Sequence, residues 1–135
     1  MLSVNERFGF EKEFKIFELL NHYFPNDNLK QQKRYSVIDF IGDENVFELK
    51  SRRIKLNTYS TIIISKNKYV EGLNHIKKNK NVFFIFNLLD GVFYININEL
   101  HEFKTFRFAK FTTNNKTDIC LFIKTTALKK LANIV

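Results

Sequence analysis

The spacing of hydrophobic residues predicts one long helix followed by a series of strands. Between positions 5 and 24, apolar residues recur every three or four positions, which is the period of an amphipathic helix. Pro25 ends this segment because proline cannot continue a helix. Beyond a polar loop at 26–33, short apolar runs alternate with turn residues, which is typical of strands. The expected strands are 35–41, 46–53, 61–65, 82–87, 92–98, 106–112 and 119–124, and further helices are expected at 68–78 and 126–133.

This order of elements predicts an α/β (α+β) domain with a mixed β-sheet flanked by helices. The chain has 135 residues and no repeat or Gly/Pro linker divides it, so we expect a single domain over 1–135. No apolar run reaches the roughly 18 residues of a membrane span, and a lone cysteine, Cys120, excludes an internal disulfide framework. We therefore expect a soluble intracellular protein, neither secreted nor bound to a membrane.

The charge of the chain favours a polyanionic partner. It carries 22 Lys and Arg against 14 Asp and Glu, which gives a formal net charge of +8. Such an excess is typical of proteins that bind nucleic acid. The chain is also rich in Lys, Asn, Ile and Phe, the residues of A/T-rich codons, so genome composition is an alternative source of the lysines.

Two carboxylates are expected to face each other on a buried hairpin. If the turn at 42–45 holds a loop of two or four residues, paired residue numbers add up to 87, and Asp39 lies opposite Glu48. At such spacing the two charges repel by about 3–4 kcal/mol at an effective dielectric near 20. Lys50 shares the face of Glu48, so the repulsion is relieved either by Lys50 or by a divalent cation. A loop of three residues would remove the opposition.

The first helix offers a third acid. Its apolar stripe is formed by Phe10, Phe14, Phe17, Leu20 and Phe24. Glu13 falls within this stripe, whereas Glu11 and Glu18 lie outside it. A carboxylate on the buried side of a helix is unfavourable unless it is paired or coordinating. Glu13 therefore either joins the acids of the hairpin or lies at the edge of the stripe and reaches solvent.

The spacing of these residues resembles the core motif of the PD-(D/E)XK nuclease superfamily. Asp39 is followed, after eight residues, by Glu48-Leu49-Lys50, and Ile38 stands where the motif name has proline. The helix at 7–13 is similar to the opening helix of the family, in which a glycine precedes an acid by four positions, here Glu13. Lys68 starts a helix after a strand, where many members carry a further lysine.

The resemblance covers about residues 5–98, while the hairpin and helix expected at 105–133 have no counterpart. It implies a restriction-endonuclease-like fold, and the layout is closest to archaeal-type Holliday junction resolvases and small viral or phage nucleases. The function that it implies is a metal-dependent DNA endonuclease that hydrolyses phosphodiester bonds in branched DNA. The alternatives are a restriction or repair nuclease acting on linear duplex, or a non-catalytic DNA-binding or structural protein that kept the fold.

The resemblance also implies roles for individual residues. Asp39, Glu48, the backbone carbonyl of Leu49 and Glu13 would bind Mg²⁺, with Mn²⁺ as a substitute. Lys50 would orient or deprotonate the attacking water, and Lys68 would contact the scissile phosphate. DNA recombination or repair, a homodimer and no small-molecule cofactor are expected.

Further basic and aromatic residues surround this motif. The candidates for contacts to DNA phosphates are Lys30, Lys33, Arg34, Arg52, Arg53 and Lys55. A solvated rim without a ligand is the alternative.

Near the C-terminus, Phe103, Phe106, Phe108 and Phe111 alternate partly with basic residues and form either a dimer surface or a nucleic-acid platform. A structural or surface role is expected for each of the three histidines, His22, His75 and His101, and Cys120 is expected in the core. The lysines at 124, 129 and 130 are expected on an ordinary helix face.

Overall fold

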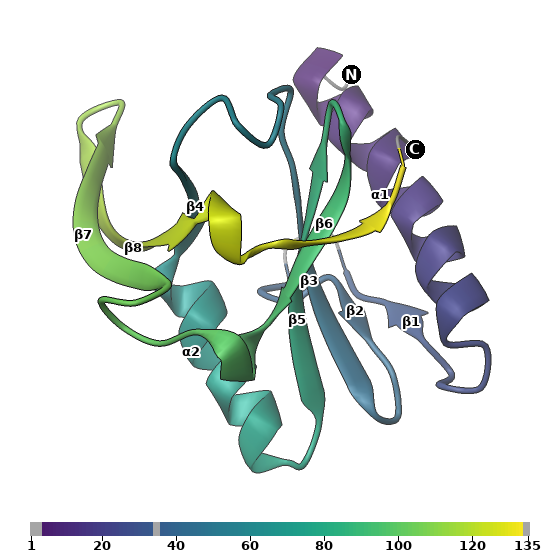
Figure 1. The fold of residues 1–135 in the computed structure, drawn as a ribbon. Helices are drawn as coiled ribbons and strands as arrows, with labels where there is room; N and C mark the ends of the chain where they lie inside the picture. The colour runs from purple at the N-terminus through teal and green to yellow at the C-terminus, as the bar shows by residue number, and fades with distance from the viewer. Residues whose placement is uncertain (1–3, 34–35, 134–135) are drawn as a thin grey trace.

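The computed structural model describes residues 4–33 and 36–133, and the side chains from position 11 onward except position 12. Within these ranges the chain is α+β, with two sheets and two α-helices (Figure 1). The helices are α1 (Val4–Tyr23) and α2 (Lys66–Lys77), with short 3₁₀ turns at Ile97–Glu99 and Thr125–Ala127. The strands are β1 (Lys30–Gln31), β2 (Phe40–Ile41), β3 (Asn45–Ser51), β4 (Thr61–Ser65), β5 (Asn81–Leu88), β6 (Gly91–Asn96), β7 (Phe106–Thr113), β8 (Lys116–Lys124) and β9 (Lys129–Ala132). No helix in the described ranges is long and apolar enough to cross a membrane.

The two sheets and the helices form layers. The larger sheet has the order β1-β2-β3-β5-β6-β9, in which β3 and β5 are parallel and the other neighbours are antiparallel. The smaller sheet has the order β4-β8-β7. Helix α1 covers one side of the larger sheet, and α2 and the smaller sheet lie on its other side (Figure 1).

Strand β3 separates two apolar clusters. Phe47 and Leu49 pack in the cluster that includes Leu20 of α1, whereas Val46 belongs to the cluster on the opposite side, with residues of β4, β5 and β8. Because side chains alternate along a strand, Glu48 points away from α1, on the same side as Val46. An apolar strand therefore places a carboxylate inside the molecule.

The structure confirms much of the predicted pattern. The helix expected at 5–24 is α1, and the strands expected near 61–65, 82–87 and 92–98 are β4, β5 and β6, the last ending earlier, at Asn96. The predicted hairpin register is also confirmed, since Phe40 pairs with Phe47 and Ile41 with Val46, and both pairs of numbers add up to 87.

The strand expected at 35–41 is much shorter than predicted. β2 covers only Phe40–Ile41, and residues 36–39 form a loop, while position 35 lies outside the described residues. The Asp39 side chain accepts the N–H of Leu49, so it occupies the hydrogen-bonding edge of β3 that a longer β2 would use. The polar loop expected at 26–33 instead contains β1, which pairs with β2.

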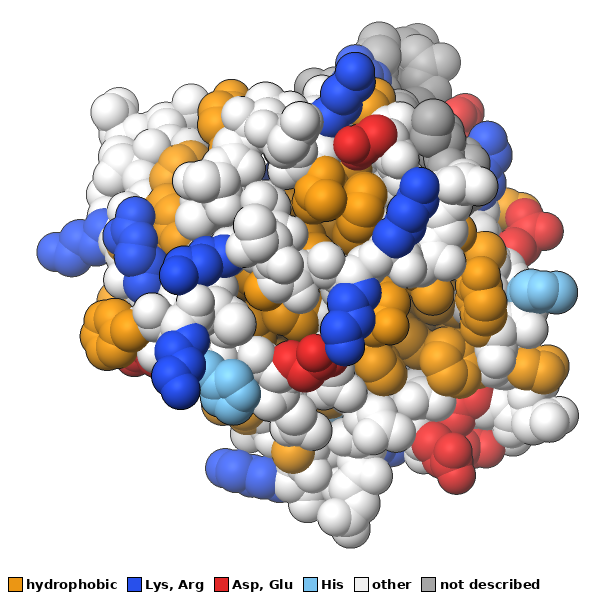
Figure 2. Space-filling view, in the orientation of Figure 1, with side chains coloured by type: hydrophobic (Ala, Val, Ile, Leu, Met, Phe, Trp, Pro, Cys, Tyr) orange, Lys and Arg blue, Asp and Glu red, His pale blue; other side chains and the backbone are white. Residues whose placement is uncertain are grey.

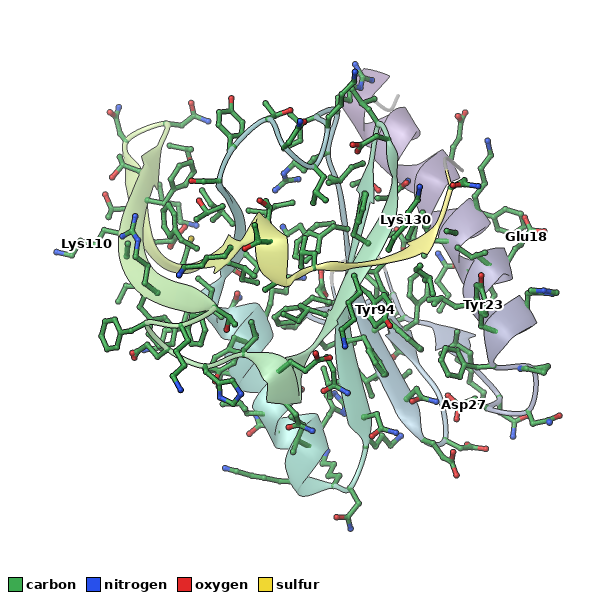
Figure 3. All side chains as sticks on the ribbon, in the orientation of Figure 1. Glu18, Tyr23, Asp27, Tyr94, Lys110 and Lys130 are labelled. Carbon is green, nitrogen blue, oxygen red and sulfur yellow. The ribbon has the colours of Figure 1, made fainter. Side chains whose placement is uncertain are left out.

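The prediction of a helix at 126–133 is wrong. This segment forms a 3₁₀ turn and then β9, which pairs with the outer edge of β6. Pairing there satisfies backbone groups that β6 would otherwise leave open. Leu131 packs in the cluster beneath α1, and its carbonyl accepts a hydrogen bond from the Tyr23 hydroxyl (3.3 Å). Figure 3 shows Lys130 on β9 and Tyr23 on α1.

Two further details of the prediction need correction. The lysines at 124, 129 and 130 lie on β8 and β9 rather than on a helix, and Lys129 pairs with Glu99 at 2.9 Å. In the predicted apolar stripe of α1, Phe14 is 55% exposed, and the fully buried positions are Ile16 and Leu20. The side chain of Phe10 is outside the described residues.

Candidate active site

The candidate site lies where β2 ends and β3 continues along the sheet. Past Phe47, the edge of β3 is covered by the loop 36–39 instead of a strand. The first turn of α2 approaches from the side of Glu48, and α1 brings Glu13 to the loop. Four separate segments therefore contribute charged side chains to one place.

Glu48 is the most deeply buried of these groups. It is 2% exposed, and its Oε1 lies 3.1 Å from Nζ of Lys68. Its Oε2 is buried and has no hydrogen-bond partner among the described residues. Burial, together with the negative charge of Asp39, raises the pKa of Glu48 to about 9 despite the opposing effect of Lys68. In the absence of a further cation, Glu48 therefore holds a proton at neutral pH.

Asp39 lies beside Glu48, as the hairpin register predicts. Its negative charge is close enough to raise the pKa of Glu48. Its Oδ2 accepts the backbone N–H of Leu49 (2.8 Å), and its own carbonyl accepts the N–H of Gln32 (2.8 Å). These two hydrogen bonds fix Asp39 on both sides, so that its position depends on backbone groups rather than on other side chains.

Glu13 joins the site from α1. It is half-buried, and its Oε1 accepts a hydrogen bond from Nε2 of Gln31 (3.1 Å). Burial raises the pKa of Glu13, as does the charge of Asp39, while Gln31 and Lys68 act in the opposite direction. Glu13 is therefore close enough to Asp39 to be affected by its charge, while its side chain stays partly exposed. Glu11 and Glu18 are exposed.

The two lysines of the motif have different environments. Lys68, at the start of α2, donates to Glu48 and to the carbonyl of Val37 (2.5 Å). Lys50 is half-buried, and burial lowers its pKa, as does Arg52, while Glu48 counteracts them. Lys68 rather than Lys50 therefore forms the ion pair with Glu48. Lys50 retains a lowered pKa, as is typical of lysines that accept protons.

The donor atoms of the site suit a hard divalent cation. Asp39 and Glu48 supply carboxylate oxygens, and Mg²⁺ is usually held by one or two carboxylates while it keeps several waters. The unpartnered Oε2 of Glu48 is the observation that a cation would explain. In the described part of the chain, no group of three His, Cys, Asp or Glu side chains is arranged to hold a metal by itself.

Exposed basic residues flank the site on two sides. Arg52, Arg53 and Lys55 follow β3, Lys30 lies on the short strand β1, and Lys33 follows that strand. Arg52 is close enough to Lys50 to lower its pKa. Arg34, also predicted to bind phosphates, lies outside the described residues. Further Lys and Arg side chains gather on the left of Figure 2, over the β7–β8 hairpin.

The aromatic residues near the C-terminus do not form a single platform. Phe106 is buried, and both Phe106 and Phe108 contact Tyr69 of α2. Phe111 lies three positions after Phe108 on the same strand. Because side chains alternate along a strand, Phe111 lies on the other face of the small sheet. Phe103 is 83% exposed and precedes β7.

The sequence analysis misses two groups of the site, and it agrees with the structure on two residues outside the site, His75 and Cys120. Gln31, which holds Glu13, and the carbonyl of Val37, which holds Lys68, carry no signal in the sequence because their roles depend on where the loop after α1 lies. His75 is buried beside Glu71, at 3.6 Å, and Cys120 is buried as expected.

Comparison with models of known protein families finds no match for this chain, and comparison with curated proteins finds none either.

Proposed function

We propose that this protein is a metal-dependent endonuclease that hydrolyses phosphodiester bonds in DNA. The observation that carries the proposal is the buried Glu48, which lies beside Asp39 and pairs with Lys68 through only one of its oxygens. Burying like charges together destabilises a fold, and such clusters with perturbed pKa values are concentrated at functional sites. Asp39, Glu48 and Lys50 resemble a nuclease motif, and this resemblance indicates the reaction that the cluster would catalyse, the hydrolysis of phosphodiester bonds.

The proposed cofactor is Mg²⁺, which Mn²⁺ would replace. Asp39 and Glu48 would hold it with the carbonyl of Leu49, whose N–H already contacts Asp39, and Glu13 would bind it directly or through water. When bound, the ion polarises the phosphate and lowers the pKa of a coordinated water. The cation would also replace the proton that Glu48 holds at neutral pH.

The two lysines act on the water and on the phosphate. Hydrolysis forms a bond between the water oxygen and phosphorus and breaks the bond to the leaving oxygen. Lys50 would orient the attacking water or accept its proton at Nζ, a role supported by its lowered pKa. A lysine ammonium has three donors, and Glu48 and Val37 take two on Lys68, so its third would contact a phosphate oxygen.

The proposed substrate is DNA, with branched DNA cut by a homodimer as the specific form. The net charge of +8 and the basic residues after β3 support a polyanionic substrate. A symmetric dimer would carry two sites, one for each of two paired cuts. The site would act inside the cell, where DNA recombination or repair takes place.

Cleavage of defined substrates tests the proposal. An end-labelled four-way junction and a linear duplex of matched sequence are incubated with Mg²⁺ or with EDTA, with Asp39→Asn as the control. We expect metal-dependent cuts at the junction that the variant does not make. Cuts in both substrates would support the endonuclease and replace branched DNA by a broader specificity. Binding without cleavage in both Mg²⁺ and Mn²⁺ would overturn the proposal in favour of a non-catalytic DNA-binding protein.

A further inference from the structure

A second concave surface adjoins the candidate site on the far side of Lys50. It is a groove of about 360 Å³ between the end of β3 and the small sheet, and Lys50 lines it. Its other walls include Arg52, Tyr59, Ile63 and Phe111. The proposed hydrolysis assigns no role to this groove, although it shares a lysine with the site.

The pairing of the small sheet explains how these side chains come together. Ser65 of β4 lies opposite Cys120 of β8, and Cys120 lies opposite Ala109 of β7. Residues directly opposite in antiparallel strands share a face, and positions two apart along a strand share it too. Ile63 and Phe111 therefore lie on this face, which is turned toward Lys50. Phe108 lies on the opposite face, against α2.

The groove combines aromatic surface with positive charge. Tyr59 is 64% exposed and Phe111 is 40% exposed, so both rings present surface to solvent. Among the described residues that line the groove, Lys50 and Arg52 are basic and none is acidic. Asp118 lies opposite Phe111, on the same face of the small sheet, and, besides burial, its charge raises the pKa of the Cys120 thiol, so it adds one negative charge beside the groove. A flat ring attached to an anion matches such walls, because bases stack on aromatic side chains while cations follow the phosphates.

We propose that this groove binds one unpaired base of the DNA strand, next to the phosphate that is attacked at the candidate site. The inference rests on the proposed nuclease function, since it takes the position of that phosphate, on the other side of Lys50, as given. The groove is at the lower end of the roughly 300–1,000 Å³ of small-ligand pockets, which suits one nucleotide. A base within a duplex is paired and stacked, so only an unpaired or extruded base can enter. The substrate class is therefore DNA with single-stranded nucleotides at the cut, as at junctions, flaps and tails.

Binding in EDTA tests the groove separately from cleavage. The full-length protein is titrated, by fluorescence anisotropy, into labelled duplexes that carry a short unpaired extension on the 5′ or the 3′ strand. Matched probes have the same extension with the bases next to the duplex removed. Tyr59→Ala and Phe111→Ala are compared with Phe108→Ala, a phenylalanine of the same strand with nearly equal exposure, 37% against 40%. Thermal melts check that each variant is folded, and the exposed Tyr59 serves as the second variant if Phe111→Ala unfolds.

We expect the wild type to bind one of the extensions with bases at least about fivefold more tightly than its abasic match, because a stacked base strengthens binding by such a factor. Tyr59→Ala and Phe111→Ala should bring this ratio close to one, and Phe108→Ala should preserve it. A ratio of one in the wild type, or equal loss in all three variants, would overturn the inference. Cleavage of paired duplex in Mg²⁺ is measured in parallel. Cleavage without a preference for the unpaired bases would leave the nuclease and remove the groove function, whereas that preference without cleavage would do the reverse.

Discussion

Glu48 on β3 and Lys68 on α2 form an ion pair of 3.1 Å in which the glutamate side chain is 2% exposed and the lysine side chain 20%. The pair joins the first turn of a helix to the central strand of the sheet. Only one oxygen of Glu48 takes part, and the other is buried without a partner among the described residues. The fold therefore leaves a carboxylate that a proton, or a cation held together with Asp39, would complete.

Stability should fall with increasing pH because of Glu48. Its pKa rises from 4.5 to about 9 on folding, so the folded protein retains a proton that the unfolded chain has lost between these values. This contribution to stability is complete below about pH 4.5 and is lost as the pH rises through about 9. Thermal unfolding is measured in EDTA from pH 6 to pH 10. Over this range the unfolding temperature of Glu48→Gln should rise by several degrees relative to that of the wild type, at about 4 °C per kcal/mol. Glu11→Gln, at an exposed position of α1, is the control, and parallel curves for Glu48→Gln and wild type would contradict the assignment.

Metal binding should release a proton. At pH 7 a bound Mg²⁺ must displace the proton that Glu48 holds, so its apparent affinity should rise by up to about tenfold per pH unit below the pKa of Glu48. Calorimetric titrations in two buffers with different ionisation enthalpies count the released protons. Glu11→Gln should release as many as the wild type. Binding of Mg²⁺ with no proton released would mean that the ion does not contact Glu48.

Two substitutions of Asp39 should distinguish the hydrogen bond that its side chain accepts from the charge that it carries. Asp39→Asn keeps an oxygen that accepts the N–H of Leu49 and should leave the free energy of unfolding almost unchanged. Asp39→Ala leaves that N–H without its acceptor and should destabilise the fold by about 1–2 kcal/mol. Urea unfolding measures both variants. Equal stability of the two would show that the Leu49 contact is unimportant for the loop.

The ion pair itself should appear as coupling between Glu48 and Lys68. Lys68→Met removes the donor to Glu48 and to the carbonyl of Val37, and should cost about 1–2 kcal/mol in the free energy of unfolding. Above about pH 9, where Glu48 is ionised, the same substitution should cost less in the Glu48→Gln background, because the buried carboxylate is already gone. A double-mutant cycle measured by urea unfolding gives the coupling. Strictly additive effects would show that the pair contributes nothing to stability.

The sequence predicts best those parts of the fold that follow from local periodicity. α1 and the register of the β2–β3 hairpin depend on spacing within one segment, and this register is what places Asp39 beside Glu48. The place of Glu13 on the helix leaves two outcomes open in the sequence. The pattern alone therefore predicts the proximity of Asp39 and Glu48, but not that of Glu13.

The remaining parts depend on contacts between distant segments. The lysine that pairs with Glu48 is set by where α2 packs, so Lys50 and Lys68 could not be distinguished in the sequence. The loop at 36–39 replaces a predicted strand because one side chain takes a backbone donor of β3. β9 forms because β6 offers an open edge, whereas its own four residues have no pattern that separates strand from helix.

The central claim is that this cluster hydrolyses DNA, and the most direct measurement is the single-turnover cleavage rate of Lys50→Met in Mg²⁺. Lys77→Met, at the exposed end of α2, is the matched control. Wild type and Lys77→Met should cut at the same rate, cutting should stop in EDTA and return with added Mg²⁺, and Lys50→Met should be slower by about 10²- to 10⁴-fold, as for the loss of a proton acceptor. Cleavage by Lys50→Met at the wild-type rate, or cleavage that persists in EDTA, would contradict the account.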